Sequence, residues 1–156
     1  MEQLWGVSTF LKKLRSRLLT GELSRAPLKL LRFQIQESKA ECDWIARPPD
    51  PWDADIATAI REKNQTLQAL RDALAIRQLL FRAIPEIQSA RFRVYQHSTG
   101  ASRDLIITGM VAREDEVSAR ISSLVMRAKL CGLHFSLREG VLVPFQVERR
   151  ELQVSS

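Results

Sequence analysis

The chain has few of the residues from which metal centres, disulfide frameworks and phosphate-binding loops are built. Its 156 residues include 2 histidines, 2 cysteines and 6 glycines. Cys42 and Cys131 stand far apart and form no Cys-x-x-Cys motif, which excludes a disulfide framework. We expect both to be small buried hydrophobic residues. The glycines form neither a Gly-x-Gly-x-x-Gly motif nor a P-loop, so no nucleotide cofactor is indicated.

Sequence motifs of the common catalytic centres are also missing. There is no Gly-x-Ser-x-Gly and no His-Glu-x-x-His, and a zinc site would need His97, His134, Cys131 and an acid to converge. Cys131 and His134 are close in sequence, but they flank an expected helix end. This placement favours a buried thiol and an exposed imidazole over a nucleophile–base pair. We therefore expect a protein that is not an enzyme and that carries no cofactor.

Long apolar segments are absent as well. The chain has no run of about 18 apolar residues, which is the length that a membrane-spanning helix requires. The N-terminus places Glu2 where a signal peptide has positive charge, and its basic cluster follows the apolar stretch instead of preceding it. These features predict a cytoplasmic location.

The composition that remains is globular, with an excess of positive charge. Apolar residues make up 45% and charged residues 27% of the chain, which is about one domain long. The net charge of +6 is concentrated in residues 1–47, which carry 9 basic and 5 acidic side chains. Such a surface attracts nucleic acid, anionic lipid or an acidic protein partner, and it also serves as an ordinary solvated face.

Residues 3–19 have the pattern of a short basic amphipathic helix. Leucines and Phe10 recur at helical spacing, and lysines and arginines lie largely between them. Such a helix either packs on its own domain or docks on a partner or an anionic membrane. The candidate partner-binding residues are Trp5, Phe10, Lys12, Lys13, Arg15 and Arg17.

The next segments predict a hairpin, a connector and a long helix. Residues 28–36 and 40–47 alternate apolar and polar side chains around a turn at residues 37–39, and residues 48–53 form a proline-rich connector. Asp53 or Asp55 is the expected N-cap of a helix that ends near Ile84. We expect Ile60 on its buried face and Asp72 on its exposed face.

The second half predicts two more strand pairs around a helix. Residues 91–95 and 105–111 alternate in polarity, and residues 133–137 and 141–147 form a hairpin at Glu139-Gly140. Between the pairs, acids at 114–116 begin a helix that Gly132 ends. Its buried stripe comprises Val117, Ile121, Leu124, Val125 and Ala128.

The element order is therefore αββ-αββ-αββ. We expect an α+β fold of three successive αββ units, with an antiparallel or mixed sheet covered by helices. In one parse, residues 1–47 form an N-terminal subdomain, 48–53 a connector, 54–147 the α+β core and 148–156 a flexible tail. In the other parse, all of these segments belong to one domain.

Residues 67–137 resemble a BON domain. The residues that carry the resemblance are Ile107-Thr108-Gly109-Met110-Val111, then Arg113-Glu114-Asp115-Glu116, and Cys131-Gly132-Leu133 before the last strand. The resemblance implies an interaction module that binds membranes, lipids or other proteins. The chain departs from the pattern by an insert at residues 98–103 and by a whole αββ unit in front. Independently of any family, Gly109 is expected at a bulge or close contact, and Gly132 at a helix end.

These patterns favour a non-enzymatic protein-interaction or adaptor module, as an oligomer or as a subunit of a larger assembly. One alternative is a nucleic-acid-binding protein in which Arg91, Arg93 and Tyr95, spaced two apart, share one face of a strand. Another is a peripheral membrane-binding domain that uses the basic N-terminal helix.

Overall fold

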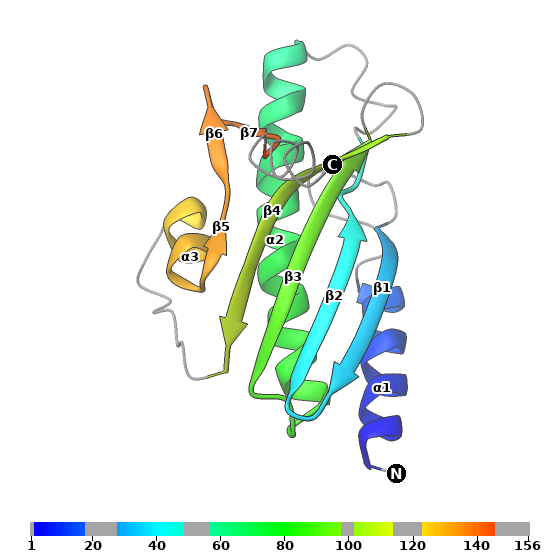
Figure 1. Ribbon diagram of the computed structural model, residues 1–156. Coiled ribbons are helices and arrows are strands. Elements are labelled where there is room, and N and C mark those ends of the chain that lie inside the picture. The colour runs from blue at the N-terminus through cyan, green and yellow to red at the C-terminus, as the bar shows by residue number, and fades with distance from the viewer. Residues whose placement is uncertain (1, 18–27, 49–56, 98–101, 114–122, 146–156) are drawn as a thin grey trace, which may run out of the picture.

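The protein has an α+β fold, with a mixed five-stranded sheet and a small two-stranded sheet. A computed structural model describes residues 2–17, 28–48, 57–97, 102–113 and 123–145. The helices within these ranges are α1 (Glu2–Arg17), α2 (Thr58–Ala83) and α3 (Leu124–Leu130). In Figure 1, α1 and α2 lie behind the large sheet, and the opposite face of the sheet is turned toward the viewer.

The large sheet has its strands in the order β1-β2-β3-β4-β5. A hairpin joins β1 to β2, a second hairpin joins β3 to β4, and β5 pairs antiparallel with β4. β2 and β3 run parallel, because α2 carries the chain across between them. The strand bounds are β1 Lys29–Gln36, β2 Lys39–Ile45, β3 Ser89–His97, β4 Arg103–Ala112 and β5 Leu133–His134.

One core joins α1 and the first hairpin to the rest of the fold. The ring centroids of Phe10 on α1 and Phe33 on β1 are 5.0 Å apart, and Trp44 meets Phe92 edge to face at 5.1 Å. Both Trp44 and Phe92 are fully buried, in the same cluster as Leu70 of α2. The strands β1 and β2 therefore share one sheet with β3, β4 and β5, and they share one core with α1 and α2.

The long helix starts later than the sequence pattern predicted. Its N-cap is Ala57, whose side chain offers no capping oxygen, whereas we expected Asp53 or Asp55, which lie outside the described residues. Ile60 was expected on the buried face, but its side chain is 52% exposed because it lies in the first turn. The predicted C-terminal end is confirmed by a C-cap at Ile84.

The third unit adds only one short strand to the large sheet. The hairpin at Glu139-Gly140 is confirmed, but its strands β6 (Ser136–Arg138) and β7 (Val141–Val143) pair with each other in the small sheet. α3 is described from Leu124, with Ser123 as its N-cap, and the expected helix start and stripe at residues 114–122 lie outside the described residues. The expected tail at 148–156 also lies outside them.

Gly109 and Gly132 face each other where β4 meets β5. A Cβ on Gly109 would lie 2.2 Å from the carbonyl oxygen of Gly132, and a Cβ on Gly132 would lie 2.3 Å from the carbonyl oxygen of Met110. Gly132 also follows Cys131, the C-cap of α3, with a φ of 102°. Both expectations, a close contact at Gly109 and a helix end at Gly132, are confirmed.

Arg113 fastens the end of β4 to the C-terminus of α2. Its Nε, Nη1 and Nη2 donate to the carbonyl oxygens of Ile87, Phe81 and Ile84 at 2.9, 2.7 and 2.9 Å. The guanidinium also lies 4.9 Å from the centre of the Phe81 ring. A positive group therefore meets the last carbonyls of the helix, where the helix dipole favours a cation.

Candidate interaction surface

Alternate side chains of the large sheet point away from the helices and form what we call the open face. Strand register aligns Arg32, Asp43, Arg93, Thr108 and His134 across the five strands in one row. A second row aligns Gln34, Glu41, Arg91 and Met110. The helix-side rows between them are apolar, as with Phe33, Cys42, Phe92, Gly109 and Leu133.

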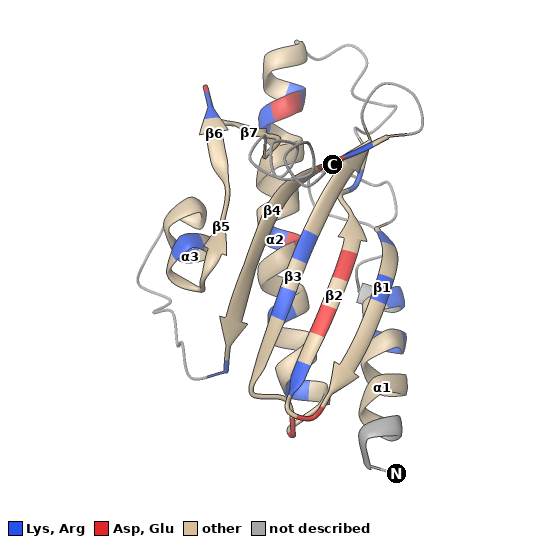
Figure 2. Ribbon diagram, viewed as in Figure 1, with Lys and Arg blue, Asp and Glu red and all other residues tan. Residues whose placement is uncertain are grey.

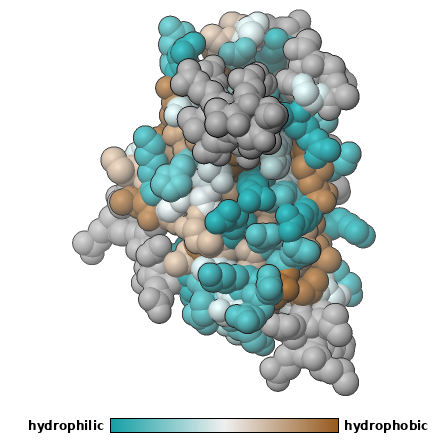
Figure 3. Space-filling model, in the orientation of Figure 1, coloured by the Kyte–Doolittle hydropathy of each residue, from teal (hydrophilic) through white to brown (hydrophobic). Residues whose placement is uncertain are grey.

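In the middle of the open face, charge alternates in sign across β1, β2 and β3, and Lys39 adds a positive charge where β2 begins. Figure 2 shows basic positions on β1 and β3 and acidic positions on β2 between them. The Nη2 of Arg32 lies 2.9 Å from the Oε2 of Glu41, with both side chains about two-fifths exposed. Figure 3 shows hydrophilic side chains gathered over the middle of this face. Opposite charges on neighbouring strands attract, so these pairs also help to hold the register.

Asp43 is an acid that is nearly buried within this charged face. Its residue surface is 8% exposed, and its Oδ1 has no hydrogen-bond partner within the described part of the chain. Burial raises the pKa of Asp43, whereas the positive charges of Arg93 and Arg32 act in the opposite direction. The positive charges of Arg93 and Arg32 thus stabilise the ionised form of the Asp43 carboxyl group, whose Oδ1 accepts no hydrogen bond from the described residues.

A hollow of about 440 Å³ lies at the end of the open face next to the β1–β2 turn. Polar side chains dominate its lining, with Lys39 and Arg91 as cations, Glu37 and Glu41 as anions, and Met110 as an apolar contact. Such a hollow can accept a side chain that carries both polar and apolar groups.

A larger groove of about 880 Å³ lies between α2 and the β6–β7 hairpin. Apolar residues such as Leu67, Val125 and Leu142 form much of its lining. The hydroxyl of Thr66 accepts a hydrogen bond from the Leu142 backbone nitrogen at 3.0 Å, which fixes the hairpin to the helix. Lys63 and Glu139 add charged groups to the lining, so the groove offers apolar contact with charge beside it.

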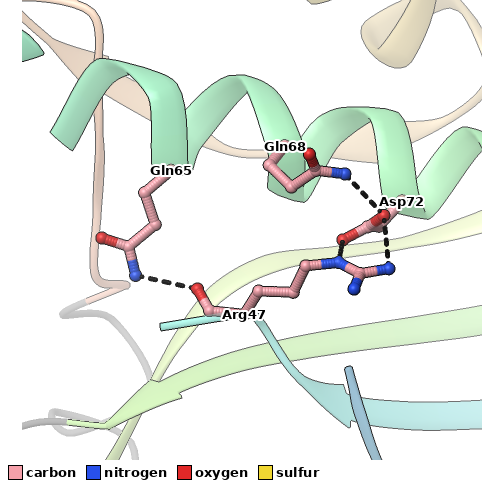
Figure 4. Close-up of polar contacts among 4 residues, drawn as sticks. All are labelled: Arg47, Gln65, Gln68 and Asp72. Carbon is pink, nitrogen blue, oxygen red and sulfur yellow. Dashed lines mark hydrogen bonds and ion pairs between the residues drawn. The ribbon is translucent and has the colours of Figure 1, made fainter. Parts of the chain in front are cut away.

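A buried ion pair ties the end of β2 to the middle of α2 (Figure 4). The Nε of Arg47 lies 2.7 Å from the Oδ2 of Asp72, and both side chains are almost fully buried. Gln68 donates to the Oδ1 of Asp72 at 2.9 Å, and Gln65 donates to the Arg47 carbonyl oxygen at 3.1 Å. Burial raises the pKa of Asp72, whereas the hydrogen bond and the charge of Arg47 act against this shift.

The exposed position predicted for Asp72 is therefore wrong. Helical spacing places Gln65, Gln68 and Asp72 on one face of α2, and this polar stripe was the signal that could have indicated a buried partner. The partner itself stands 25 residues earlier, just before the proline-rich connector. No short-range pattern links the two residues.

The predicted partner-binding helix docks on its own domain through its apolar side. Phe10 is fully buried and Leu14 is 6% exposed, both in the common core. Lys12, Lys13 and Arg15 remain exposed. The side chains of Trp5 and Arg17 lie outside the described residues. While α1 is docked, Phe10 is thus not available to a partner.

The three residues of the nucleic-acid hypothesis do lie together on the open face. Arg91, Arg93 and Tyr95 alternate along β3 with the fully buried Phe92 and Val94. However, Glu41 and Asp43 are in register with Arg91 and Arg93 on the neighbouring strand. The basic residues thus share the face with an acidic row, which weakens the positive potential that a polyanion would meet.

The candidate nucleophile and metal ligands do not form a site. Cys131 is buried and His134 is exposed, as expected, with His134 on the open face. Burial, with a smaller contribution from Asp43, raises the pKa of the Cys42 thiol. Within the described ranges, no group of three or more histidine, cysteine or acidic side chains could hold a metal ion.

The helices of the described residues include none whose length and apolar character would let it cross a bilayer. No protein family, curated protein or solved structure matches this chain, so the interpretation of the open face depends on its geometry alone.

Proposed function

We propose that this protein is a non-enzymatic protein-interaction module that binds a protein partner through the open face of its large sheet. The observation that carries the proposal is the patterned open face itself. Rows of opposite charge are held in register on β2 and β3, beside a polar hollow and the 41% exposed Met110.

Several physical features support a protein partner. The side chains of the open face stand on regular strands, and a packed core supports these strands from behind. Side chains on such strands are held more precisely than side chains on loops. Alternating charge favours a partner with the complementary pattern and disfavours partners of a single charge sign, because like charges brought together are repelled. A methionine beside charged groups adds an adaptable apolar contact.

Nucleic acid is the second candidate, because Arg91, Arg93 and Tyr95 lie on one face. It comes second because the acids of β2 stand in register with both arginines. A membrane-peripheral role is third. The docked α1 offers Lys12, Lys13 and Arg15 to anionic lipid, but its buried Phe10 is withheld from insertion. A cytoplasmic location stays a prediction.

The test compares two double variants with the same change in net charge. Arg91→Gln/Arg93→Gln removes two positive charges from the open face, and Lys12→Gln/Lys13→Gln removes two from the exposed side of α1. Tagged proteins are used to capture partners from nuclease-treated native extract, after thermal unfolding has confirmed that both variants fold. We expect protein partners that the open-face variant loses and the α1 variant keeps.

Other outcomes contradict the proposal in distinguishable ways. Partners lost only by the α1 variant would move the contact surface to the helix. Nucleic acid recovered without nuclease, with binding that falls steeply as salt rises, would favour the second candidate. Flotation with anionic vesicles that depends on Lys12 and Lys13 would favour the third.

A further inference from the structure

The polar hollow beside the β1–β2 turn brings together side chains from four neighbouring strands. Its lining includes Gln34 and Gln36 of β1, Lys39 and Glu41 of β2, Arg91 of β3 and Met110 of β4. Figure 2 shows this end of the open face, where basic positions on β2 and β3 stand near the acidic turn. Which ligand the hollow can accept depends on which of these groups are still free to bind.

Glu41 is an acid of this lining that already has a partner. The Nη2 of Arg32, which stands outside the hollow, lies 2.9 Å from the Oε2 of Glu41. The same nitrogen donates a hydrogen bond to the Oε1 of Gln34. Arg32 therefore balances the charge of Glu41. It also occupies the amide oxygen of Gln34, whose amide nitrogen makes no hydrogen bond within the described part of the chain.

Arg91 and Lys39 are the cations of the hollow. Both are exposed, and neither forms an ion pair with any residue that the structure describes. Arg93, two residues further along β3, differs from Arg91 because its charge acts on the nearly buried Asp43. Arg91 lacks such a neighbour, since the acid in register with it is paired with Arg32.

The free groups of the hollow favour a ligand with a single negative charge. Because Arg32 balances Glu41, the two cations of the lining stand against one acid, Glu37 of the turn. Hydrogen-bond donors outnumber acceptors as well, because lysine and arginine side chains only donate. A carboxylate supplies one negative charge and accepts hydrogen bonds with both oxygens, and it can bind an arginine in a bidentate way.

We propose that the hollow is a carboxylate site, filled by a glutamate side chain of the protein partner, with Arg91 as its main contact and Lys39 as the second cation. The apolar stem of the glutamate packs on Met110, which is 41% exposed. An aspartate has a shorter stem and less apolar contact. The repeated phosphates of a nucleic acid match the hollow less well, because Glu37 and Glu41 line it too.

This inference rests on the proposed function, because it names the group that the open face recognises in its partner. Nuclear magnetic resonance of the isotope-labelled full chain tests it without knowledge of that partner. The probe is glutamate blocked at both backbone ends, and blocked glutamine is the matched control, with nearly the same shape and no charge. At constant ionic strength, the glutamate probe should shift the amide signals around the hollow and saturate in the millimolar range. Glutamine should bind at least about fivefold more weakly.

Single substitutions assign the contact. Arg91→Gln and Lys39→Gln should each weaken binding of the glutamate probe about fivefold. Lys12→Gln makes the same change of charge on α1 and should bind the probe as wild type does. Glu37→Gln removes the acid that repels the probe and should strengthen binding about twofold, a gain that loss of folding cannot imitate. All four positions are exposed, so the fold is retained.

Three results would overturn the proposal: no saturable shift at the hollow, equal binding of glutamine, or binding that Arg91→Gln leaves unchanged. Inorganic phosphate that binds the hollow more tightly than the glutamate probe would also overturn it, in favour of nucleic acid.

Failure of this proposal differs from failure of the proposed function. A partner that Arg91→Gln/Arg93→Gln loses, although the hollow binds no glutamate, would reject the carboxylate site and retain the open face. Glutamate bound at the hollow, with partners that this double variant still captures, would retain the site and reject the proposed function.

Discussion

Asp72→Ala removes the carboxylate from the buried ion pair and leaves the Arg47 guanidinium without its counterion. The Arg47 and Asp72 side chains are 1% and 2% exposed, and the Nε–Oδ2 distance is 2.7 Å. Breaking a buried pair by removing one partner costs about 3–5 kcal/mol, because an uncompensated charge remains in the interior. Domains of this size are stable by about 5–15 kcal/mol, so the variant should lose a large share of its stability.

Urea unfolding, followed by circular dichroism and by tryptophan fluorescence, to which the buried Trp44 contributes, measures this loss. The matched control is the double variant Arg47→Met/Asp72→Leu, which replaces the pair by apolar side chains. We expect the double variant to lie within about 2 kcal/mol of wild type, because removing both charges also removes the cost of burying them. Part of the remaining loss comes from Gln68, which donates to Asp72 in the native protein.

Asp72→Ala should therefore be less stable than the double variant by about 1 kcal/mol or more. A loss of less than about 1 kcal/mol for Asp72→Ala would refute the reasoning, since it would mean that water reaches the guanidinium. A double variant as unstable as Asp72→Ala would also refute the reasoning. The loss of stability would then come from altered packing and not from an unpaired charge.

Three further predictions concern other parts of the fold. Arg113→Ala removes three hydrogen bonds to carbonyl oxygens at and just beyond the C-terminal end of α2 and should cost about 2–3 kcal/mol in chemical unfolding, and Arg113→Lys should recover only part of this loss. The free energy of unfolding of Asp43→Asn, relative to that of wild type, should increase as the pH rises from about 3 to 7. Because burial raises the pKa of Asp43 above its ordinary 3.8, wild type loses stability as the pH rises through the raised value; a difference that does not change with pH contradicts this. Gly109→Ala forces a methyl group against the Gly132 carbonyl and should lower the melting temperature by about 10 °C or more, whereas an unchanged value would show that β5 shifts freely.

Local patterns predicted most of the elements of this fold. Alternation along residues 28–36 and 91–95 predicted β1 and β3, because one face of each strand is buried against the helices. Turn chemistry predicted the β6–β7 hairpin, where Glu139 and Gly140 both adopt positive φ. In each case the residues that decide the structure are neighbours in the sequence.

The features that were missed depend on residues far apart in the sequence. Alternation alone could not show that β2 pairs with β3, nor that the hairpin after α3 leaves the large sheet. Asp72 was assigned to solvent because an acid in a helix is usually exposed, and its buried partner Arg47 lies on another element. The irregularity between Val94 and Tyr95 had no sequence signal either, and it shifts Leu105 away from the alternation that we expected for β4.

The candidate surface was predicted in part. The spacing of Arg91, Arg93 and Tyr95 correctly predicted one shared strand face. It could not predict the acidic row beside them, because Glu41 and Asp43 reach that position through a parallel pairing across α2. The neighbours of the arginines thus changed the balance among the candidate partners.

The parallel pairing of β2 with β3 connects the stability of this fold to the surface that it presents. No tight turn sets the register of these strands, because the whole of α2 lies between them in the chain. A shift of one residue would move the charges of β2 to the helix side and bring Cys42 and Trp44 to the open face.

Two contacts act against such a shift. Trp44 packs on Phe92 in the core, and Arg47, two residues beyond β2, is fixed to Asp72 of α2. The buried ion pair thus does more than stabilise the domain, because it helps to keep the acids of β2 beside the arginines of β3. A variant that lacks both charges can therefore remain folded, and the alignment of its open face then depends on the core alone.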